Sequence, residues 1–264
     1  MGVLYKRQFT EQMYEEDVHH IPVHGRLLWF LFVKLQRFNS HLEDVVVDLF
    51  CGGGRFLDVG CGDGDLCLKA KGKFKGVFGM DIAQNRIQRA QKRDQAIHFS
   101  VADLDEILPF KNEIFDAVTC IAAFQYCFDP YRVIKEFYRV LKKDGTLVIQ
   151  VTNIAWLPYR IKLLFGGLLT TSLAQNYGWD GGVLHYFTFR TLEDFLRCQG
   201  FNIARTTGSG IFSKWRRWWL SLRRAFMISE SPCIGMSMKN TASFWPTRKV
   251  ASCCAGFMKN PRLR

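Results

Sequence analysis

Short apolar runs alternate with helical segments along the middle of the chain, and this alternation restricts the fold more than any other feature. Five apolar runs predict strands at residues 56–59, 77–82, 97–102, 115–121 and 146–152. The segments 65–71, 83–92 and 131–141 between them predict helices. Strands this apolar are covered on both faces, so the sequence predicts an α/β fold with a mostly parallel, doubly wound sheet. A sheet of this kind binds ligands at the carboxyl ends of its strands.

Beyond residue 152 this alternation stops. Residues 153–184 are rich in glycine and aromatic residues and predict an insertion. A helix is expected at 191–199, with strands at 201–207 and 232–238. The expected organisation is an N-terminal helical lid at 1–44, a main domain at 45–240 and a basic, poorly ordered tail at 241–264.

Composition fits one α/β domain with appendages, since the chain has 264 residues and is 48% hydrophobic. The net charge of +12 is not evenly spread. Residues 1–200 carry 24 basic and 23 acidic side chains, whereas residues 201–264 carry 12 basic side chains and one acid. A run from Lys214 to Arg224 mixes cations with tryptophans. This pattern is open to two interpretations: contact with anionic lipid head groups or nucleic acid, or a connection between strands packed on the domain.

The cysteine pattern and the apolar runs bear on location. None of the nine cysteines forms a C-x-x-C pair, which favours reduced thiols over a disulfide framework or a zinc site, so no metal is expected. The longest apolar run, 27–33, is far shorter than the roughly 18 residues that a bilayer requires. We therefore expect a cytoplasmic protein, with peripheral membrane contact through the basic C-terminal quarter as an alternative.

A glycine-rich turn follows the first predicted strand. In LDVGCGDG (57–64), Gly60 and Gly62 permit tight backbone angles and close approach to a ligand. The turn carries carboxylates at Asp58, Asp63 and Asp65, which would repel a pyrophosphate and suit a cationic ligand. An earlier segment, VVVDLFCGGG (45–54), also looks like a strand followed by a glycine turn. We interpret residues 51–54 as the loop before the first strand, because Asp48 lies 33 residues before Asp81, too far for one βαβ step.

Two further acids end the next two predicted strands. Asp81 can accept hydrogen bonds from both hydroxyls of a ribose. Asp103 can accept one from an adenine amino group, while Ile82 and Leu104 flank the ring. Acids at three successive strand ends predict a pocket for an adenosine without phosphates, and S-adenosylmethionine has the matching ribose, adenine and sulfonium cation.

With these segments the chain resembles the class I S-adenosylmethionine-dependent methyltransferases. The matching pieces are LDVGCGDG (57–64), GMDIA (79–83), ADLDEILPF (102–110), FDAVTC (115–120), RVLKKDGTLVI (139–149) and HYFTFRTLEDFLRCQGF (185–201). Within that family the likeness is strongest to the MetW-type proteins. The resemblance implies a Rossmann-like, seven-stranded sheet whose last strand is antiparallel, with S-adenosyl-L-methionine as cofactor. It also implies that Asp58, Gly60, Cys61 and Gly62 surround the methionine part of this donor.

The sequence says less about the residues that bind the methyl acceptor than about those that bind the methyl donor. Methyl transfer needs a base only if the acceptor must lose a proton, and His185 and Tyr126 are the weak candidates for a catalytic role. His185 is equally compatible with packing in an aromatic segment. The candidates for binding the methyl acceptor are Gln125, Asn153, Trp156, Arg160, Trp179 and Tyr186.

The favoured function is methyl transfer from S-adenosylmethionine to a small-molecule or lipid-like acceptor. A MetW-like alternative is a protein that binds S-adenosylmethionine and regulates a biosynthetic partner enzyme with little turnover of its own. A third interpretation is RNA methylation guided by the basic C-terminal quarter.

Overall fold

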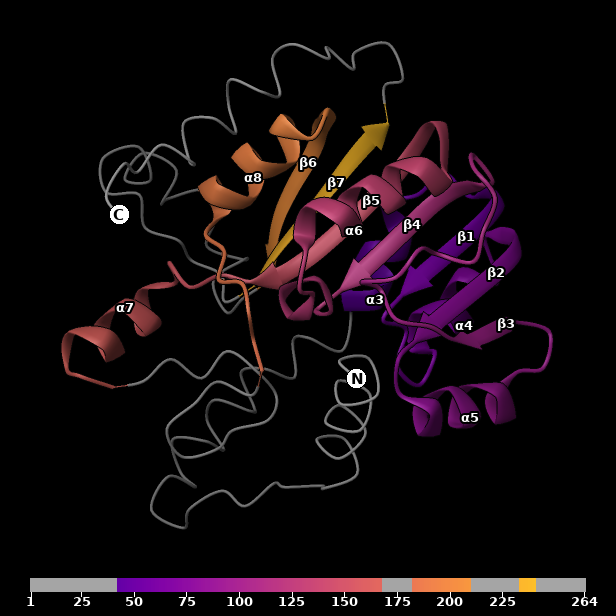
Figure 1. Ribbon diagram of the computed structural model, residues 1–264, viewed down its shortest axis with the longest axis horizontal. Helices are drawn as coiled ribbons and strands as arrows, with labels where there is room; N and C mark the ends of the chain where they lie inside the picture. The colour runs from indigo at the N-terminus through magenta and orange to yellow at the C-terminus, as the bar shows by residue number, and fades with distance from the viewer. Residues whose placement is uncertain (1–41, 168–181, 210–232, 241–264) are drawn as a thin grey trace, which may run out of the picture.

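The computed structural model describes residues 42–167, 182–209 and 233–240 (Figure 1). Its strands are β1 (Gly53–Val59), β2 (Phe74–Asp81), β3 (His98–Val101), β4 (Phe115–Ile121), β5 (Leu141–Thr152), β6 (Phe201–Ser209) and β7 (Cys233–Asn240). They form one sheet in the order β3-β2-β1-β4-β5-β7-β6. Strands β1 to β5 are parallel, and β7 runs antiparallel to both of its neighbours. The predicted mostly parallel, Rossmann-like sheet is confirmed.

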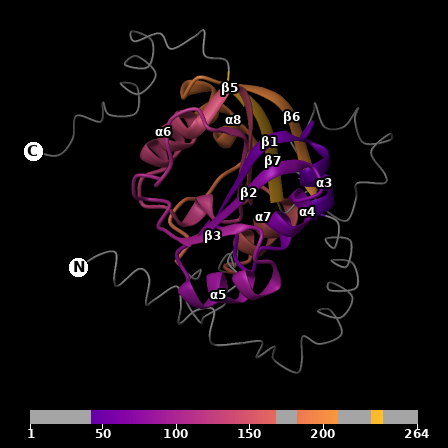
Figure 2. The ribbon, with the colours of Figure 1, turned by 90° about the vertical axis from the view of Figure 1, so that its right-hand side faces the viewer.

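Helices connect the strands and cover the sheet on both faces (Figure 2). They are α3 (Leu42–Asp48), α4 (Asp65–Ala70), α5 (Gln84–Arg93), α6 (Pro130–Val140), α7 (Leu157–Leu164) and α8 (Phe189–Cys198), with a 3₁₀ turn, η3 (Phe124–Tyr126), after β4. Among the described helices, none is both long and apolar enough to cross a bilayer.

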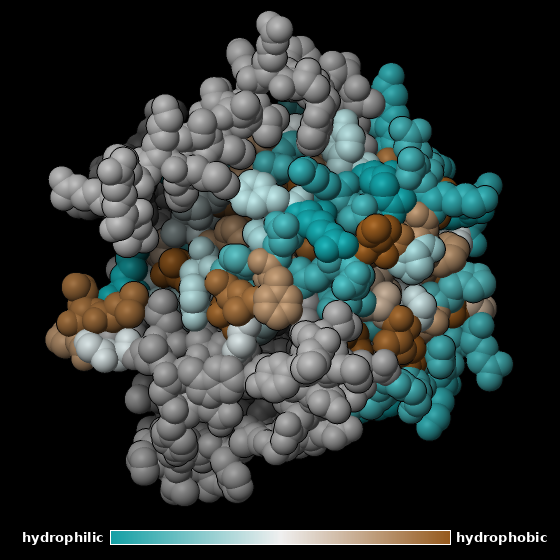
Figure 3. Space-filling model, viewed as in Figure 1, coloured by the Kyte–Doolittle hydropathy of each residue, from teal (hydrophilic) through white to brown (hydrophobic). Residues whose placement is uncertain are grey.

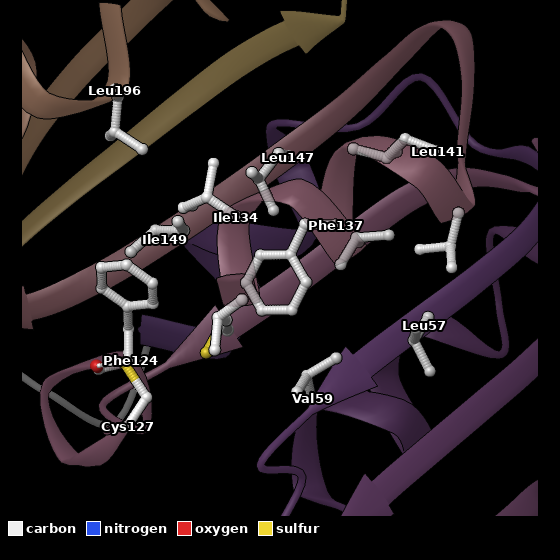
Figure 4. Packing of buried hydrophobic residues seen from close by; sticks show 14 of the residues in the cluster. Leu57, Val59, Phe124, Cys127, Ile134, Phe137, Leu141, Leu147, Ile149 and Leu196 are labelled. Atoms are coloured by element: carbon white, nitrogen blue, oxygen red, sulfur yellow. Dashed lines mark hydrogen bonds between the residues drawn. The ribbon is translucent and has the colours of Figure 1, made fainter. Parts of the chain in front are cut away.

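Two apolar clusters lie on the two faces because successive strand residues point in opposite directions. In β1, Leu57 belongs to the cluster that includes Phe137 of α6 and Leu196 of α8 (Figure 4). Its neighbour Phe56 belongs to the other cluster, with residues of α3, α4 and α5. This alternation directs the side chain of Asp58 toward the α4 face, under the turn that follows β1.

Local capping explains where two helices begin. Asp129 accepts hydrogen bonds from the backbone N–H groups of Tyr131 and Arg132, and Pro130 occupies the first turn of α6. Thr188 and Thr191 form a reciprocal capping box at the start of α8. These signals are local in sequence, which is why both helices could be anticipated.

The structure departs from the predicted boundaries in two informative places. Strand β1 begins at Gly53, so Gly53 and Gly54 belong to the strand and not, as predicted, to the loop before it. Strand β5 begins at Leu141, five residues before the predicted start at 146. Leu141 is completely buried and pairs with Phe115, and the register then shifts before Ala117. Asp144, with φ of 63°, lies within this irregular stretch, so the polar residues 142–145 interrupt the pairing without ending the strand. Residues 1–41 of the predicted lid, the tail at 241–264 and the run from Lys214 to Arg224 lie outside the described residues.

Candidate functional site

The crevice of the sheet lies where the strand order reverses, between β1 and β4. The segments that leave these two strands touch: a methyl group at Gly60 would collide with the side chain of Ala123. Ala122, the residue directly after β4, has a positive φ of 57°, which is uncommon for a residue with a side chain. Backbone strain of this kind persists where the surroundings enforce it, and it is frequent at functional sites.

The turn after β1 is held against the end of β2. The backbone N–H groups of Gly60 and Cys61 both donate to the carbonyl oxygen of Met80, at 2.8 and 3.0 Å. Gly60, Gly62 and Gly64 have φ values of 78°, 55° and 82°, and Gly64 caps α4. These angles explain the G-x-G-x-G sequence, because residues with side chains rarely adopt them.

Gly60→Ala is expected to destabilise the fold by about 2–5 kcal/mol, through the left-handed backbone and the collision with Ala123. Gly166→Ala is the matched control. Gly166 has a similar φ of +73°, but none of the described residues has an atom within 4 Å of an added methyl group, so only the backbone cost of about 1–2 kcal/mol is expected. Urea unfolding measures both. Equal losses would contradict the close contact between the two turns.

Asp81 ends β2 and is 8% exposed. Its two carboxylate oxygens accept hydrogen bonds from the backbone N–H groups of Gly62 and Ala83, each at 2.9 Å. A carboxylate has about four lone-pair positions, so one on each oxygen remains available. The carboxylate of Asp81 therefore fixes the glycine turn and can also accept hydrogen bonds from two neighbouring hydroxyl groups.

Asp58 lies beneath the same turn and is 2% exposed. Thr119 of β4 donates its hydroxyl to Oδ1 at 2.7 Å, and the thiol of Cys67 lies 3.9 Å from Oδ2. Burial raises the pKa of Asp58 to about 7, with a further increase from the charge of Asp81 and an opposing effect of the Thr119 hydrogen bond. A cation bound at the turn would favour the ionised form of this carboxyl group.

Asp103 follows β3 and is also 8% exposed. Its Oδ1 accepts the backbone N–H of Asp105 at 3.0 Å, which fixes the carboxylate at the start of the loop. Ile82 and Leu104 are half-buried beside the acids of β2 and β3. The chemistry of this set fits an adenosine: acids near three neighbouring strand ends, apolar side chains beside two of them, and a turn with three glycines at 60, 62 and 64.

The sequence argument was wrong about the charge of the turn. Asp63 and Asp65 do not act as additional carboxylates for a cation, because arginines of α5 neutralise them. Asp63 pairs with Arg86 at 3.2 Å and Arg89 at 2.8 Å, and Asp65 pairs with Arg93 at 2.7 Å. Burial alone would raise the pKa of Asp63, but the hydrogen bonds and charges of these arginines lower it overall.

These arginines were the functional residues missed from the sequence. The guanidinium of Arg86 lies over Gly62, 2.7 Å from the position that a side chain would take, so α5 supports the turn from outside. The available signal was their spacing, since positions 86, 89 and 93 share one face of a helix.

On the other side of the crevice, Gln125 joins three segments. Its side-chain oxygen accepts the backbone N–H of Thr152 at 3.0 Å. Its backbone carbonyl accepts the N–H groups of Leu184 and His185, at 3.0 and 3.1 Å. Gln125 is 3% exposed, so it holds the end of β5 and the segment before α8 beside η3.

His185 is consequently fixed near the end of β4. Its Nε2 is buried and has no hydrogen-bond partner among the described residues. A buried polar atom without a partner is costly in a folded protein, and a catalytic role or a bound water or ion are among the explanations for one. His185 is therefore the strongest of the acceptor-side candidates.

The other acceptor-side candidates are spread over this edge. Asn153 is 1% exposed, bridges to Phe187 and accepts the backbone N–H of Ala155. Trp156 is buried and packs edge-on against Tyr159. Tyr126 is half-buried, whereas Arg160 and Tyr186 are exposed. Trp179 lies outside the described residues. No disulfide bond is formed by the cysteines at 51, 61, 67, 120, 127 and 198. Among the residues that the structure describes, no group of side chains could hold a metal ion.

Comparison with known proteins is consistent with this geometry. Residues 57–149 match the family model described as a methyltransferase domain. A demethylmenaquinone methyltransferase of Thermotoga maritima is 29% identical over 167 residues, 57% of this chain and 71% of its own length. The bovine mitochondrial ubiquinone biosynthesis O-methyltransferase is 27% identical over 164 residues, 59% of this chain but only 43% of its own length. This chain therefore matches less than half of the bovine protein.

The fold also matches a solved structure. A crystal structure of an S-adenosylmethionine-dependent methyltransferase of Thermotoga maritima superposes with a TM-score of 0.57 and 20% identity. The match covers 87% of this chain and 99% of that one, so the likeness of fold extends well beyond residues 57–149.

Proposed function

Because the chain belongs to the class I S-adenosylmethionine-dependent methyltransferases, we propose that it transfers the methyl group of S-adenosylmethionine to a small or lipid-like acceptor. The observation that carries this proposal is the set of buried acids near the ends of β1, β2 and β3, beside a glycine-rich turn. S-Adenosylmethionine supplies an activated methyl group on a sulfonium cation. The protein has to hold this group, align the acceptor and exclude water.

Each donor-side residue has a distinct role in this proposal. Asp81 accepts the ribose hydroxyls with the lone pairs that Gly62 and Ala83 do not use. Asp103 accepts the adenine amino group, with Ile82 and Leu104 beside the ring. Gly60, Cys61 and Gly62 line the methionine part with backbone, and the carboxyl group of Asp58 beneath them favours the positive charge.

The names of the relatives support a quinone-like or other small acceptor. One relative is named for ubiquinone biosynthesis and O-methylation, and another for demethylmenaquinone methylation. An oxygen acceptor requires that a hydroxyl proton be removed, and the buried Nε2 of His185 is suited to accept it. The acceptor oxygen would then form its bond to the methyl carbon while the electron pair of the S–C bond stays on sulfur.

His185→Gln is expected to lower turnover about 100-fold while leaving the affinity for S-adenosylmethionine unchanged, because it removes the proton acceptor alone. His98→Gln is the control, since His98 is exposed on β3, where it stacks on Phe78. Added imidazole should partly restore a His185→Ala variant. A purely packing role predicts no rescue and a lower thermal stability instead.

The proposed function is tested by incubating the purified protein with methyl-labelled S-adenosylmethionine and a panel of demethylated quinols and phenols. Transfer of label that is abolished in the Asp81→Ala variant supports it. The proposal would be contradicted if the protein binds S-adenosylmethionine but transfers label neither to the panel nor to any component of membrane or cytosolic extracts.

Two alternatives and the expected location stay predictions. A regulatory, MetW-like role is disfavoured because the relatives reported above are named as methyltransferases. RNA methylation and membrane contact through the basic C-terminal quarter depend mostly on residues outside the described part of the chain. A cytoplasmic location is proposed on the sequence alone.

A further inference from the structure

Helix α7 begins at the acceptor side of the sheet and leads away from it. Trp156, which is 7% exposed, precedes the helix, and its carbonyl oxygen accepts the backbone N–H groups of Tyr159 and Arg160. Its ring also packs edge-on against Tyr159, with ring centres 5.0 Å apart. The first turn of α7 is thus anchored just beyond β5, while the rest of the helix stands off from the sheet (Figure 1).

The far end of α7 exposes three consecutive apolar side chains. Leu163, Leu164 and Phe165 are 50%, 83% and 86% exposed. Gly166 follows the helix with φ of 73° and donates its N–H to the carbonyl of Leu163. An added methyl group there would have no atom of the described residues within 4 Å. In the space-filling view these residues form a hydrophobic projection at the edge of the molecule (Figure 3).

The same helix is positively charged. The sequence of α7, LPYRIKLL, contains Arg160 and Lys162 and no acidic residue. Arg160 is exposed one turn before the apolar end. Apolar side chains next to cations suit the surface of an anionic membrane, where the apolar groups enter the acyl boundary and the cations remain among phosphates.

A membrane fits this surface better than a protein groove does. A helix that docks in a groove presents apolar residues along one stripe, at spacings of three and four residues. Residues 163–165 are instead consecutive at the end of α7 and just beyond it, so they do not form such a stripe. This arrangement suits insertion of the tip into a soft, laterally uniform layer.

We propose that the apolar end of α7, Leu163–Leu164–Phe165, inserts into anionic lipid membranes and thereby directs the acceptor side of the sheet toward the bilayer. The helix continues from the strand end that carries Asn153, and Asn153 bridges to the segment that carries His185. An acceptor embedded in the membrane would then meet the protein on its reactive side. This last step, the lipid-borne acceptor, rests on the proposed function, whereas the membrane contact does not.

Co-sedimentation with vesicles tests the contact. The full chain is mixed at physiological salt with vesicles of phosphatidylcholine alone or of phosphatidylcholine and phosphatidylglycerol in equal parts. The wild-type protein is expected to bind the anionic vesicles. Combining Leu163→Ser, Leu164→Ser and Phe165→Ser is expected to lower the partition coefficient about tenfold or more.

Ile107→Ser combined with Phe128→Ser provides a matched control, because these side chains are 69% and 63% exposed but lie outside α7. Their loss should leave vesicle binding unchanged. Unchanged binding of the α7 variant, abolished by high salt, would assign the contact to the basic C-terminal quarter and overturn the proposal. Absence of wild-type binding would also overturn it.

Titration of the same proteins with S-adenosylmethionine separates this proposal from the proposed function. The α7 variant should bind the donor like the wild type, since its substitutions are far from the acids of β1 to β3. Vesicle binding without donor binding would refute the proposed function and leave the membrane contact standing. Donor binding without vesicle binding would refute the membrane contact and leave the proposed function standing.

Discussion

Replacement of Asp81 by alanine is expected to weaken binding of S-adenosylmethionine by several hundred-fold, about 3–4 kcal/mol. The variant loses charge-assisted hydrogen bonds to two ribose hydroxyls. It also loses the acceptors for Gly62 and Ala83, so the glycine turn is no longer fixed to the end of β2. Isothermal titration calorimetry measures the affinity directly.

Asp94→Ala is the matched control for this experiment. Asp94 also accepts the backbone N–H two residues ahead, from Ala96 at 2.8 Å, but it follows α5 and pairs with Lys71 on the surface. Its loss should leave donor affinity within about twofold. If Asp81→Ala retained wild-type affinity while remaining folded, the assignment of the donor site to the end of β2 would be wrong.

Asp58→Asn is expected to remove a large pH-dependent contribution to stability. The pKa of Asp58 is about 7 in the folded protein and about 4 in the unfolded chain, because burial disfavours the carboxylate. Between these values the folded state binds more protons than the unfolded state, so this group stabilises the fold at low pH. The contribution is lost as the pH rises toward 7 and amounts to at most about 4 kcal/mol.

Urea unfolding of the wild type and the Asp58→Asn variant, measured from about pH 4 to 8, isolates this contribution. The difference between the two free energies is needed because other carboxyl groups act with the opposite sign. Arg139 and a backbone N–H, for example, lower the pKa of Glu136, so its contribution is lost as the pH falls. The variant should gain stability relative to the wild type as the pH increases. A difference that does not change with pH would show that Asp58 does not titrate in this window.

The Asp58→Asn variant should also change how the affinity for S-adenosylmethionine depends on pH. A cation at the turn favours ionised Asp58, so wild-type affinity for S-adenosylmethionine should increase with pH through about 7. The side-chain amide that Asp58→Asn introduces cannot ionise, so the affinity of the variant should vary less with pH. S-Adenosylhomocysteine, which lacks the sulfonium charge, is the matched ligand and should show the weaker pH dependence in both proteins.

Much of the sheet could be predicted because its signals are local. The strand at 115–121 coincides with β4. Asp58 is the penultimate residue of β1, Asp81 ends β2 and Asp103 follows β3, close to where the apolar runs placed them. The ion pairs of Asp63 and Asp65 could not be anticipated in this way. They depend on how α5 packs against the turn, which is a property of the folded chain.

The predicted insertion at 153–184 shows a second limit to predicting the structure from the sequence. Aromatic and glycine residues at 153–184 obscured the short helix α7, which has no strong apolar periodicity and whose ends are set by Trp156 and Gly166. The three consecutive valines at 45–47 likewise resembled a strand, yet they lie in α3. Val46 and Val47 are buried in the cluster under α4, so tertiary packing overrides their preference for strands.

The contact between Gly60 and Ala123 limits how this scaffold can diversify. The side chain of Ala123 already lies against Gly60, so a larger residue at position 123 would have to fit beside the turn that follows β1, even if it improved the fit to a new acceptor. Residues such as Tyr126, Arg160 and Tyr186 are less enclosed and can be exchanged at smaller structural cost. Laboratory evolution toward other acceptors should therefore accumulate substitutions around the rim of the crevice, while position 123 stays small in every active clone.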